Sequence, residues 1–210
     1  PAVDQHETLP FSVNYEQLRK DIVINGAPLP VSDATLKIGD YWRLTYVSKL
    51  TNGAVHQNSH STKLSVGTRF SGKYRCVTAN YYRIGVLTYT AKDWPAETVI
   101  ESVDATQYRV VDYLGAEVFD GNTYYFTIDS NDVIGYPANR PDGTPQVGND
   151  QPFITCITNP LDMLLVNCAT SNKVVRDNVN GKDLLYMSYG YYTPGSGPRT
   201  FYQVMEKIVE

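Results

Sequence analysis

The chain has 210 residues, a formal net charge of −4 and three cysteines. This length suits a single β-rich domain with a substantial core. Acidic and basic residues are interspersed without a basic stripe, and no apolar run reaches the roughly 18 residues of a membrane helix. The composition therefore argues against a nucleic-acid surface and against a membrane span.

Residues 1–38 form an N-terminal lead-in segment ahead of the first long strand. Asn14 is a suitable N-cap for a short helix over 15–21, and Gln17 stands three residues later, as in a capping box. The polar residues 32–35 predict one further helical turn.

Residues 40–50 alternate with period two, which predicts the first long strand and places Trp42, Leu44 and Tyr46 on one face. The Asn-, Ser-, Thr- and His-rich stretch 51–71 is interpreted as a long loop. Asp120-Gly121-Asn122 is a hairpin signal. Further strands are predicted at 73–83, 86–92, 98–103, 107–119, 123–129, 152–158, 162–169 and 183–191.

The end of the chain, 198–210, is predicted to be an amphipathic helix. Pro198 suits the first helical position. Phe201, Val204, Met205 and Ile208 fall at helical spacing and would form one apolar stripe.

Two short patches resemble the lipocalin family. The stretch from Gly39 to Trp42 is similar to the Gly-x-Trp motif of the first lipocalin strand, displaced by one residue, and Cys76, Ala79 and Tyr81 match a pattern of the second strand. The basic residue that the family places after its last strand is missing from 186–190.

The resemblance implies an all-β fold, an eight-stranded up-and-down antiparallel β-barrel over 39–197 with a C-terminal α-helix over 198–210 packed on it. Trp42 or Tyr41 would then plug the closed end of the barrel, next to Phe201, and the larger indole and the alternation favour Trp42. A β-sandwich or jelly roll, which also needs many short strands, is the alternative fold.

The resemblance further implies a secreted carrier that binds a small hydrophobic ligand in the barrel calyx: a carotenoid, bilin, retinoid, fatty acid or other pigment or lipid. Pro1 in place of Met fits a processed secretory chain or an edited one. The loop 51–71 would cover the barrel mouth. The expected ligand-binding residues are His56, His60, Tyr46, Tyr81, Tyr89, Tyr108, Tyr125 and Phe153.

The alternative function is a non-enzymatic β-sandwich module for interaction or coat assembly, which predicts self-association into homo-oligomers. No nucleophile–base pattern, phosphate loop or metal-ligand spacing stands out, so we expect no enzyme, no catalytic cofactor and no metal. Cys76, Cys156 and Cys168 allow one internal disulfide at most, and the sequence leaves its pairing open.

Overall fold

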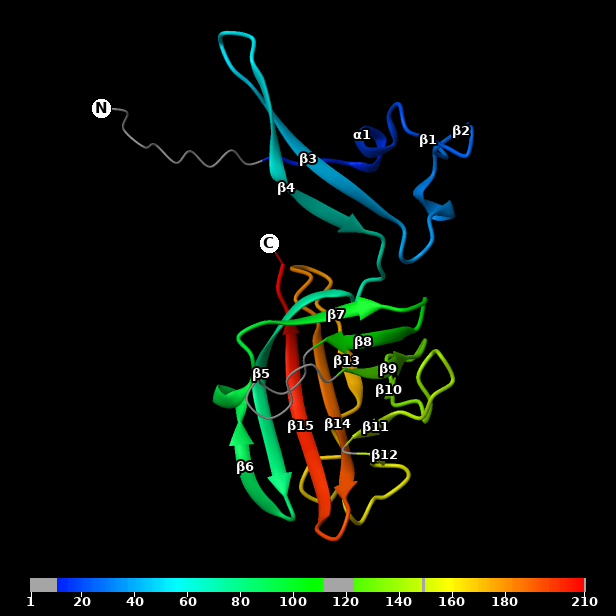
Figure 1. Ribbon diagram of the computed structural model, residues 1–210. Helices are drawn as coiled ribbons and strands as arrows, with labels where there is room; N and C mark the ends of the chain where they lie inside the picture. Colours follow the sequence, from blue (N-terminus) through cyan, green and yellow to red (C-terminus); the bar gives the residue numbers. More distant parts are fainter. Residues whose placement is uncertain (1–10, 112–122, 149, 210) are drawn as a thin grey trace, which may run out of the picture. The chain divides into compact units, whose positions relative to one another are not determined.

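The structure, a computed structural model, describes residues 11–111, 123–148 and 150–209. The chain divides into two compact units (Figure 1), unit 1 over Pro1–Val66 and unit 2 over Gly67–Glu210. From the sequence, we expect a lead-in up to residue 38 and one barrel over 39–197. In the structure, the first long strand belongs to unit 1 and lies in a small sheet of its own.

Unit 1 begins with the predicted helix, which is confirmed. The Asn14 side chain accepts the Gln17 backbone N–H at 3.0 Å, and the Gln17 side chain accepts the Asn14 N–H at 2.9 Å, so the capping box is complete. The expected turn at 32–35 is also present. The elements of unit 1 are α1 (Tyr15–Arg19), β1 (Val23–Ile24), β2 (Ala27–Pro28), η1 (Asp33–Thr35), β3 (Tyr41–Lys49) and β4 (Val55–Ser65).

The prediction of a loop over 51–71 is wrong, because most of this stretch is strand β4, which pairs antiparallel with β3 from Tyr41↔Ser65 to Lys49↔Val55. The tip around Asn52 and Gly53 turns, and a second turn at 69–70 follows β4. All side chains of β4 are exposed, so neither face of this strand requires apolar residues. Its polar composition therefore resembles that of a loop.

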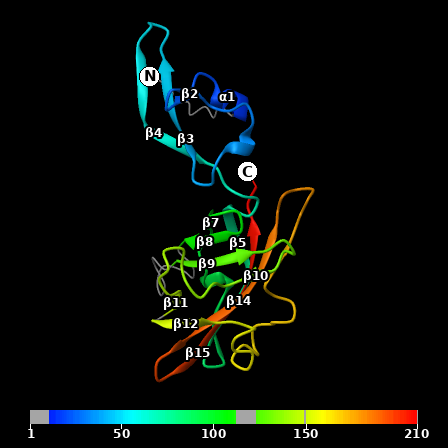
Figure 2. The ribbon, with the colours of Figure 1, turned by 90° about the vertical axis from the view of Figure 1, so that its right-hand side faces the viewer.

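Unit 2 is an antiparallel sheet that curls into a half-barrel, with β7, β8 and β9 running across the direction of β14 and β15 (Figures 1 and 2). The main strand order is β10-β9-β8-β7-β5-β15-β14-β12-β11, with β6 on β5 and β13 on β14. The all-β class is confirmed, but an 11-stranded sheet replaces the expected eight-stranded barrel. The hairpin signal Asp120-Gly121-Asn122 lies outside the described residues.

The elements of unit 2 are β5 (Gly72–Arg83), β6 (Val86–Thr90), η2 (Ala91–Asp93), β7 (Thr98–Ser102), β8 (Gln107–Val111), β9 (Tyr124–Ile128), β10 (Ile134–Gly135), β11 (Val147–Gly148), β12 (Gln151–Ile154), β13 (Lys173–Val175), β14 (Leu184–Thr193) and β15 (Gly197–Lys207).

The prediction of a C-terminal helix over 198–210 is wrong, because this stretch forms β15, a central strand between β5 and β14. Phe201 and Met205 belong to the main core, whereas Tyr202 packs on the opposite side of the sheet. A strand that is covered on both faces carries apolar residues at odd and even positions, and here their spacing coincides with that of an apolar helical stripe. Hydrogen-bonded pairing with β5 and β14 stabilises the strand over the helix.

The concave side of the half-barrel is filled by aromatic rings in mutual contact. Tyr189 stacks on Phe201 at 4.9 Å between ring centroids and on Phe153 at 5.4 Å. Gln203, itself buried, accepts the Trp94 indole N–H at 3.0 Å and donates to the Tyr124 hydroxyl at 2.8 Å. The indole N–H of Trp94 and the hydroxyl of Tyr124 thus have hydrogen-bond partners inside the core.

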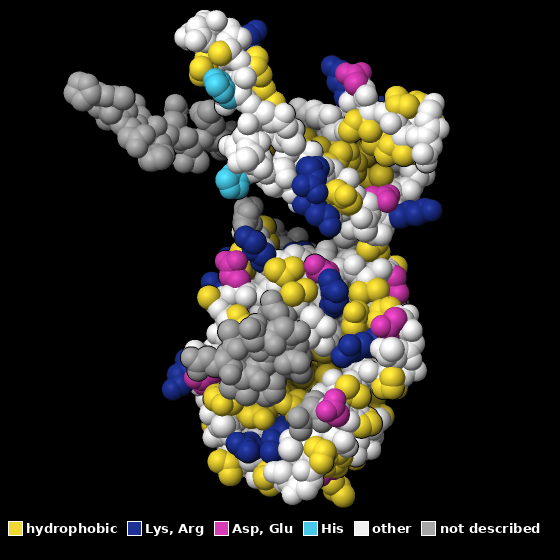
Figure 3. Space-filling model, viewed as in Figure 1, with side chains coloured by type: hydrophobic (Ala, Val, Ile, Leu, Met, Phe, Trp, Pro, Cys, Tyr) yellow, Lys and Arg dark blue, Asp and Glu magenta, His cyan; other side chains and the backbone are white. Residues whose placement is uncertain are grey.

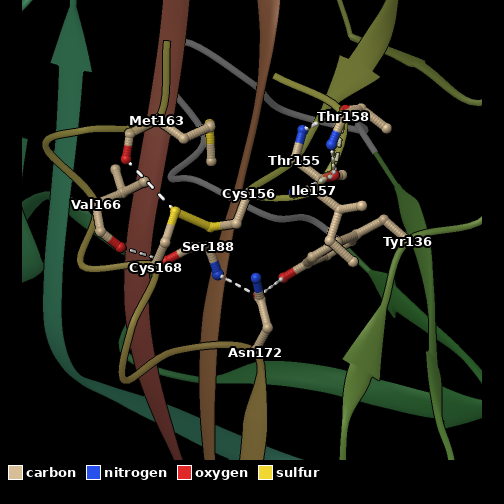
Figure 4. The surroundings of a disulfide bond; sticks show 10 residues. All are labelled: Tyr136, Thr155, Cys156, Ile157, Thr158, Met163, Val166, Cys168, Asn172 and Ser188. Atoms are coloured by element: carbon tan, nitrogen blue, oxygen red, sulfur yellow. Dashed lines mark hydrogen bonds between the residues drawn. A yellow bond between two sulfur atoms is a disulfide. The ribbon is translucent and has the colours of Figure 1, made fainter. Parts of the chain in front are cut away.

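A disulfide between Cys156 and Cys168 closes a loop on the other side of the sheet (Figure 4). The strand expected at 162–169 is wrong, since these residues form consecutive turns within that loop. Met163 and Val166 are buried under it, and the Ser188 hydroxyl donates to the Val166 carbonyl at 2.6 Å. The cross-link lets a short turn-rich segment bury these two side chains without strand pairing.

Replacing both Cys156 and Cys168 by Ser should lower the free energy of unfolding of unit 2 by about 3 kcal/mol, because the loop entropy of the unfolded chain is restored. Urea unfolding measures this through Trp94 emission in a Trp42→Phe background. Cys76→Ser is the control, since Cys76 forms no disulfide bond. Equal unfolding midpoints for the double variant and this control would contradict the stabilising role of the disulfide.

A buried ion pair holds the start of unit 2. The Arg69 guanidinium donates to both Asp183 carboxylate oxygens at 2.7 and 2.8 Å, and the Asp183 side chain is 1% exposed. Burial alone would raise the pKa of Asp183, but the Arg69 bonds and the Asp177 backbone N–H outweigh it and lower the pKa.

Because its folded-state pKa is depressed, Asp183 stabilises unit 2 above its unfolded pKa of about 4, and this contribution is lost as the pH falls through the folded pKa. Asp183→Asn should lower the free energy of unfolding by about 3 kcal/mol near neutral pH. It should also reduce the further loss of stability as the pH falls below about 4. Glu97→Gln, on an exposed ion pair, should change little. An unchanged acid-induced loss of stability in Asp183→Asn would refute the role.

Candidate functional site

In unit 1, a groove of about 860 Å³ separates the N-terminal segment from the start of β3. One wall is mostly apolar, with Ile24, Leu29 and Leu36, and also includes the polar residues Asn25, Thr35 and Lys37. The other wall consists of residues Gly39–Arg43, Asp40 among them. Figure 3 shows hydrophobic side chains gathered over this part of unit 1.

A second groove of about 400 Å³ continues along the same strand, between Phe11 and Val13 on one side and Arg43–Tyr46 on the other. Arg43 lines both grooves. Consecutive residues of β3 form the walls, so the grooves follow the edge of β3 that β4 does not occupy rather than one face of the hairpin. Together they make one elongated apolar track, which we call the β3 groove.

The ring contacts of unit 1 show which side chains lie on each face of the hairpin. Trp42 packs edge-to-face on Tyr15 at 6.1 Å, and Tyr46 packs similarly on Phe11 at 6.3 Å. The N-terminal segment therefore lies against the Trp42 side of β3. Lys63 lies over the Tyr41 ring at 4.7 Å on the opposite side.

Unit 1 buries little of its apolar surface. None of the side chains that the structure describes in 11–33 and 35–66 is fully buried. Within the described residues, β3 and β4 pair only with each other, so each keeps one edge free of strand pairing. Its exposed apolar side chains are Phe11, Val13, Val23, Ile24, Val31, Tyr41, Tyr46, Val47, Leu50, Val55 and Leu64.

The hairpin carries positive charge without an acidic counterpart. Arg43 and Lys63 stand directly opposite each other in the register, and neither forms an ion pair among the described residues. The Arg43 guanidinium donates to the Ser61 hydroxyl at 3.2 Å.

Three of the residues expected to bind a ligand lie in unit 1, where only Tyr46 lines the β3 groove. Its hydroxyl shares a hydrogen bond of 2.7 Å with that of Thr62. His56 and His60 lie in strand β4 with exposed side chains, not in a loop over a barrel mouth. The His60 backbone N–H donates to the Asn58 side chain at 2.9 Å.

The other five expected residues belong to the sheet of unit 2. Tyr81 and Tyr108 are buried, and Tyr89, Tyr125 and Phe153 are half-buried. Tyr81 stacks on Tyr89 at 5.5 Å. Tyr108 stacks on Phe126 at 5.3 Å, and Phe153 stacks on Tyr189. Four of these rings pack in the core on the concave side, whereas Tyr125 alternates on β9 with the buried Tyr124 and Phe126 and is not part of that core. Their role in ligand binding stays a prediction.

The expected plug of the barrel has a different partner. Trp42 is half-buried in unit 1 against Tyr15, whereas Phe201 lies in the core of unit 2 against Tyr81 and Tyr189. The two residues belong to separate units, so the motif around Trp42 does not close the curled sheet.

Reactive groups are few in the described part of the chain. The Cys76 thiol forms no disulfide and donates to the Thr78 carbonyl at 3.4 Å. Burial raises its pKa to about 12, so it stays protonated at neutral pH and is a poor nucleophile. No three of the described His, Cys, Asp or Glu side chains are grouped to hold a metal ion. None of the described helices is long and apolar enough to cross a membrane.

No family model matches the chain, and no curated protein matches it.

Sequence reasoning missed the first wall of the groove. Ile24, Leu29 and Leu36 lie in the segment that was interpreted as a lead-in. One signal was available: Pro28-Leu29-Pro30 places an apolar residue between two prolines, which favours an extended backbone with unpaired groups.

The two tryptophans report separately on the two units. Trp42 lines the β3 groove, and Trp94 is 8% exposed in the core of unit 2. Trp94→Phe should therefore leave a red-shifted emission that acrylamide quenches readily, and Trp42→Phe a blue-shifted, protected one. Equal quenching constants in the two variants would contradict the open groove.

Proposed function

We propose that the chain is a non-enzymatic interaction protein that binds an extended polypeptide segment along the β3 groove of unit 1. The observation that carries this proposal is the elongated apolar track at a free strand edge, in a unit with no fully buried described side chain.

Physical chemistry supports a partner at this edge. A two-stranded hairpin is at best marginally stable in water, and a third strand with apolar contacts stabilises it. A segment that pairs with β3 would satisfy main-chain groups and place alternate side chains against Trp42 and Ile24. Exposed strand edges normally carry protection, and this one instead has apolar walls.

The volume of the larger groove favours a second candidate. About 860 Å³ suits a small apolar ligand, since such sites span about 300–1,000 Å³. A carrier of a lipid or pigment would then use unit 1 rather than a barrel calyx. Organic extraction of the natively purified protein followed by mass spectrometry tests this candidate, and an extract free of lipid and chromophore rejects it.

The polypeptide proposal is tested with a random library of short peptides displayed on phage and selected on the full chain. Selected peptides are then titrated into the Trp94→Phe protein, where Trp42 is the only indole. We expect a blue shift of the Trp42 emission and reduced acrylamide quenching, because an added strand shields the groove.

Two neighbouring substitutions make a matched pair. Ile24 lines the groove and is 54% exposed, whereas Val23 does not line it and is 62% exposed. Ile24→Asp should weaken peptide binding by about tenfold, or about 1.4 kcal/mol, and Val23→Asp should leave it unchanged. A selection without enrichment, or equal weakening by both substitutions, would reject the groove as a polypeptide site.

A further inference from the structure

The hairpin contains a destabilising charge arrangement. Arg43 on β3 and Lys63 on β4 are direct cross-strand neighbours, and like charges at such positions repel. The whole hairpin, residues 41–65, has a third basic residue, Lys49, and no acidic one. Figure 3 shows dark-blue but no magenta side chains on it in that view. The repulsion is relieved when an anionic group approaches.

The position of this pair relates it to the β3 groove. Side chains alternate between the two faces of a strand, so a segment added at the edge of β3 presents one set of side chains to each face. One set would meet the apolar side with Trp42 and Leu44. The other set would meet the side that carries Arg43, Lys63 and the exposed Tyr41.

We propose that the partner of unit 1 is a polypeptide segment that alternates apolar and acidic side chains, with its carboxylates next to Arg43, on the face to which Lys63, the cross-strand neighbour of Arg43, adds positive charge. This inference rests on the proposed function and adds the partner's charge. It selects a polypeptide over a simple polyanion, because a polyanion would use the two cations and leave the apolar walls of the groove in water.

The test uses three fluorescently labelled peptides in which Val alternates with Glu, Ser or Lys, titrated into the full chain by fluorescence anisotropy. At low ionic strength the Val–Glu peptide should bind about fivefold more tightly than the Val–Ser peptide, and the Val–Lys peptide more weakly than both. At about 1 M salt, where the Debye length is about 3 Å, the three affinities should converge.

Lys63→Glu is the decisive variant, since Lys63 lies outside the walls of the grooves and the new carboxylate would pair with Arg43. It should weaken Val–Glu binding by about tenfold while leaving Val–Ser binding and the unfolding midpoint of unit 1 no lower than in the parent. Lys49→Glu makes the same charge change at the far end of β3, opposite Val55, and should have less than about a twofold effect.

The outcomes separate the two proposals. Equal binding of the Val–Glu and Val–Ser peptides overturns the acidic partner and leaves the groove as a polypeptide site. Failure of all three peptides to perturb Trp42 counts against the polypeptide site itself. Tighter binding of a DNA or sulfated oligosaccharide, lost in Lys63→Glu and unaffected by Ile24→Asp, would show that the cations serve a polyanion and would reject the polypeptide partner.

Discussion

The fold of unit 2 depends on the position of β15 in the middle of its sheet. This strand pairs with β5 on one side and β14 on the other, and it places Phe201 between Tyr81 and Tyr189. The stacked rings join strands that are far apart in the sequence, and their size fixes how tightly the sheet curls. Without this strand the aromatic residues of the neighbouring strands would have no common surface to cover.

The two units use their apolar residues in opposite ways. Unit 2 packs large rings at nearly complete burial, and Gln203 and Asn172 bond the hydroxyls of Tyr124 and Tyr136 (Figure 4). Unit 1 leaves large apolar side chains exposed in its N-terminal segment and on both strands of its hairpin. The dense core of the described chain is therefore confined to unit 2.

Local signals in the sequence were sufficient for some elements and not for others. The Asn14–Gln17 capping box and the short connection Ile84-Gly85 depend on neighbouring residues, and both strands around that connection form as expected. The strand β15 was mistaken for a helix because burial on both faces removes the period-two pattern. The β3 groove could not be predicted, since it exists only where the segment 22–36 returns to lie beside β3.

The connection between the two units is very short. Val66 ends unit 1, and Thr68 is already held in unit 2, where its backbone N–H donates to the Ser102 hydroxyl at 2.9 Å and its own hydroxyl donates to that of Tyr108 at 2.8 Å. Arg69 follows with its bonds to Asp183. A mechanical pull on unit 1 would therefore load these side-chain bonds before it reached the hydrogen bonds of β5.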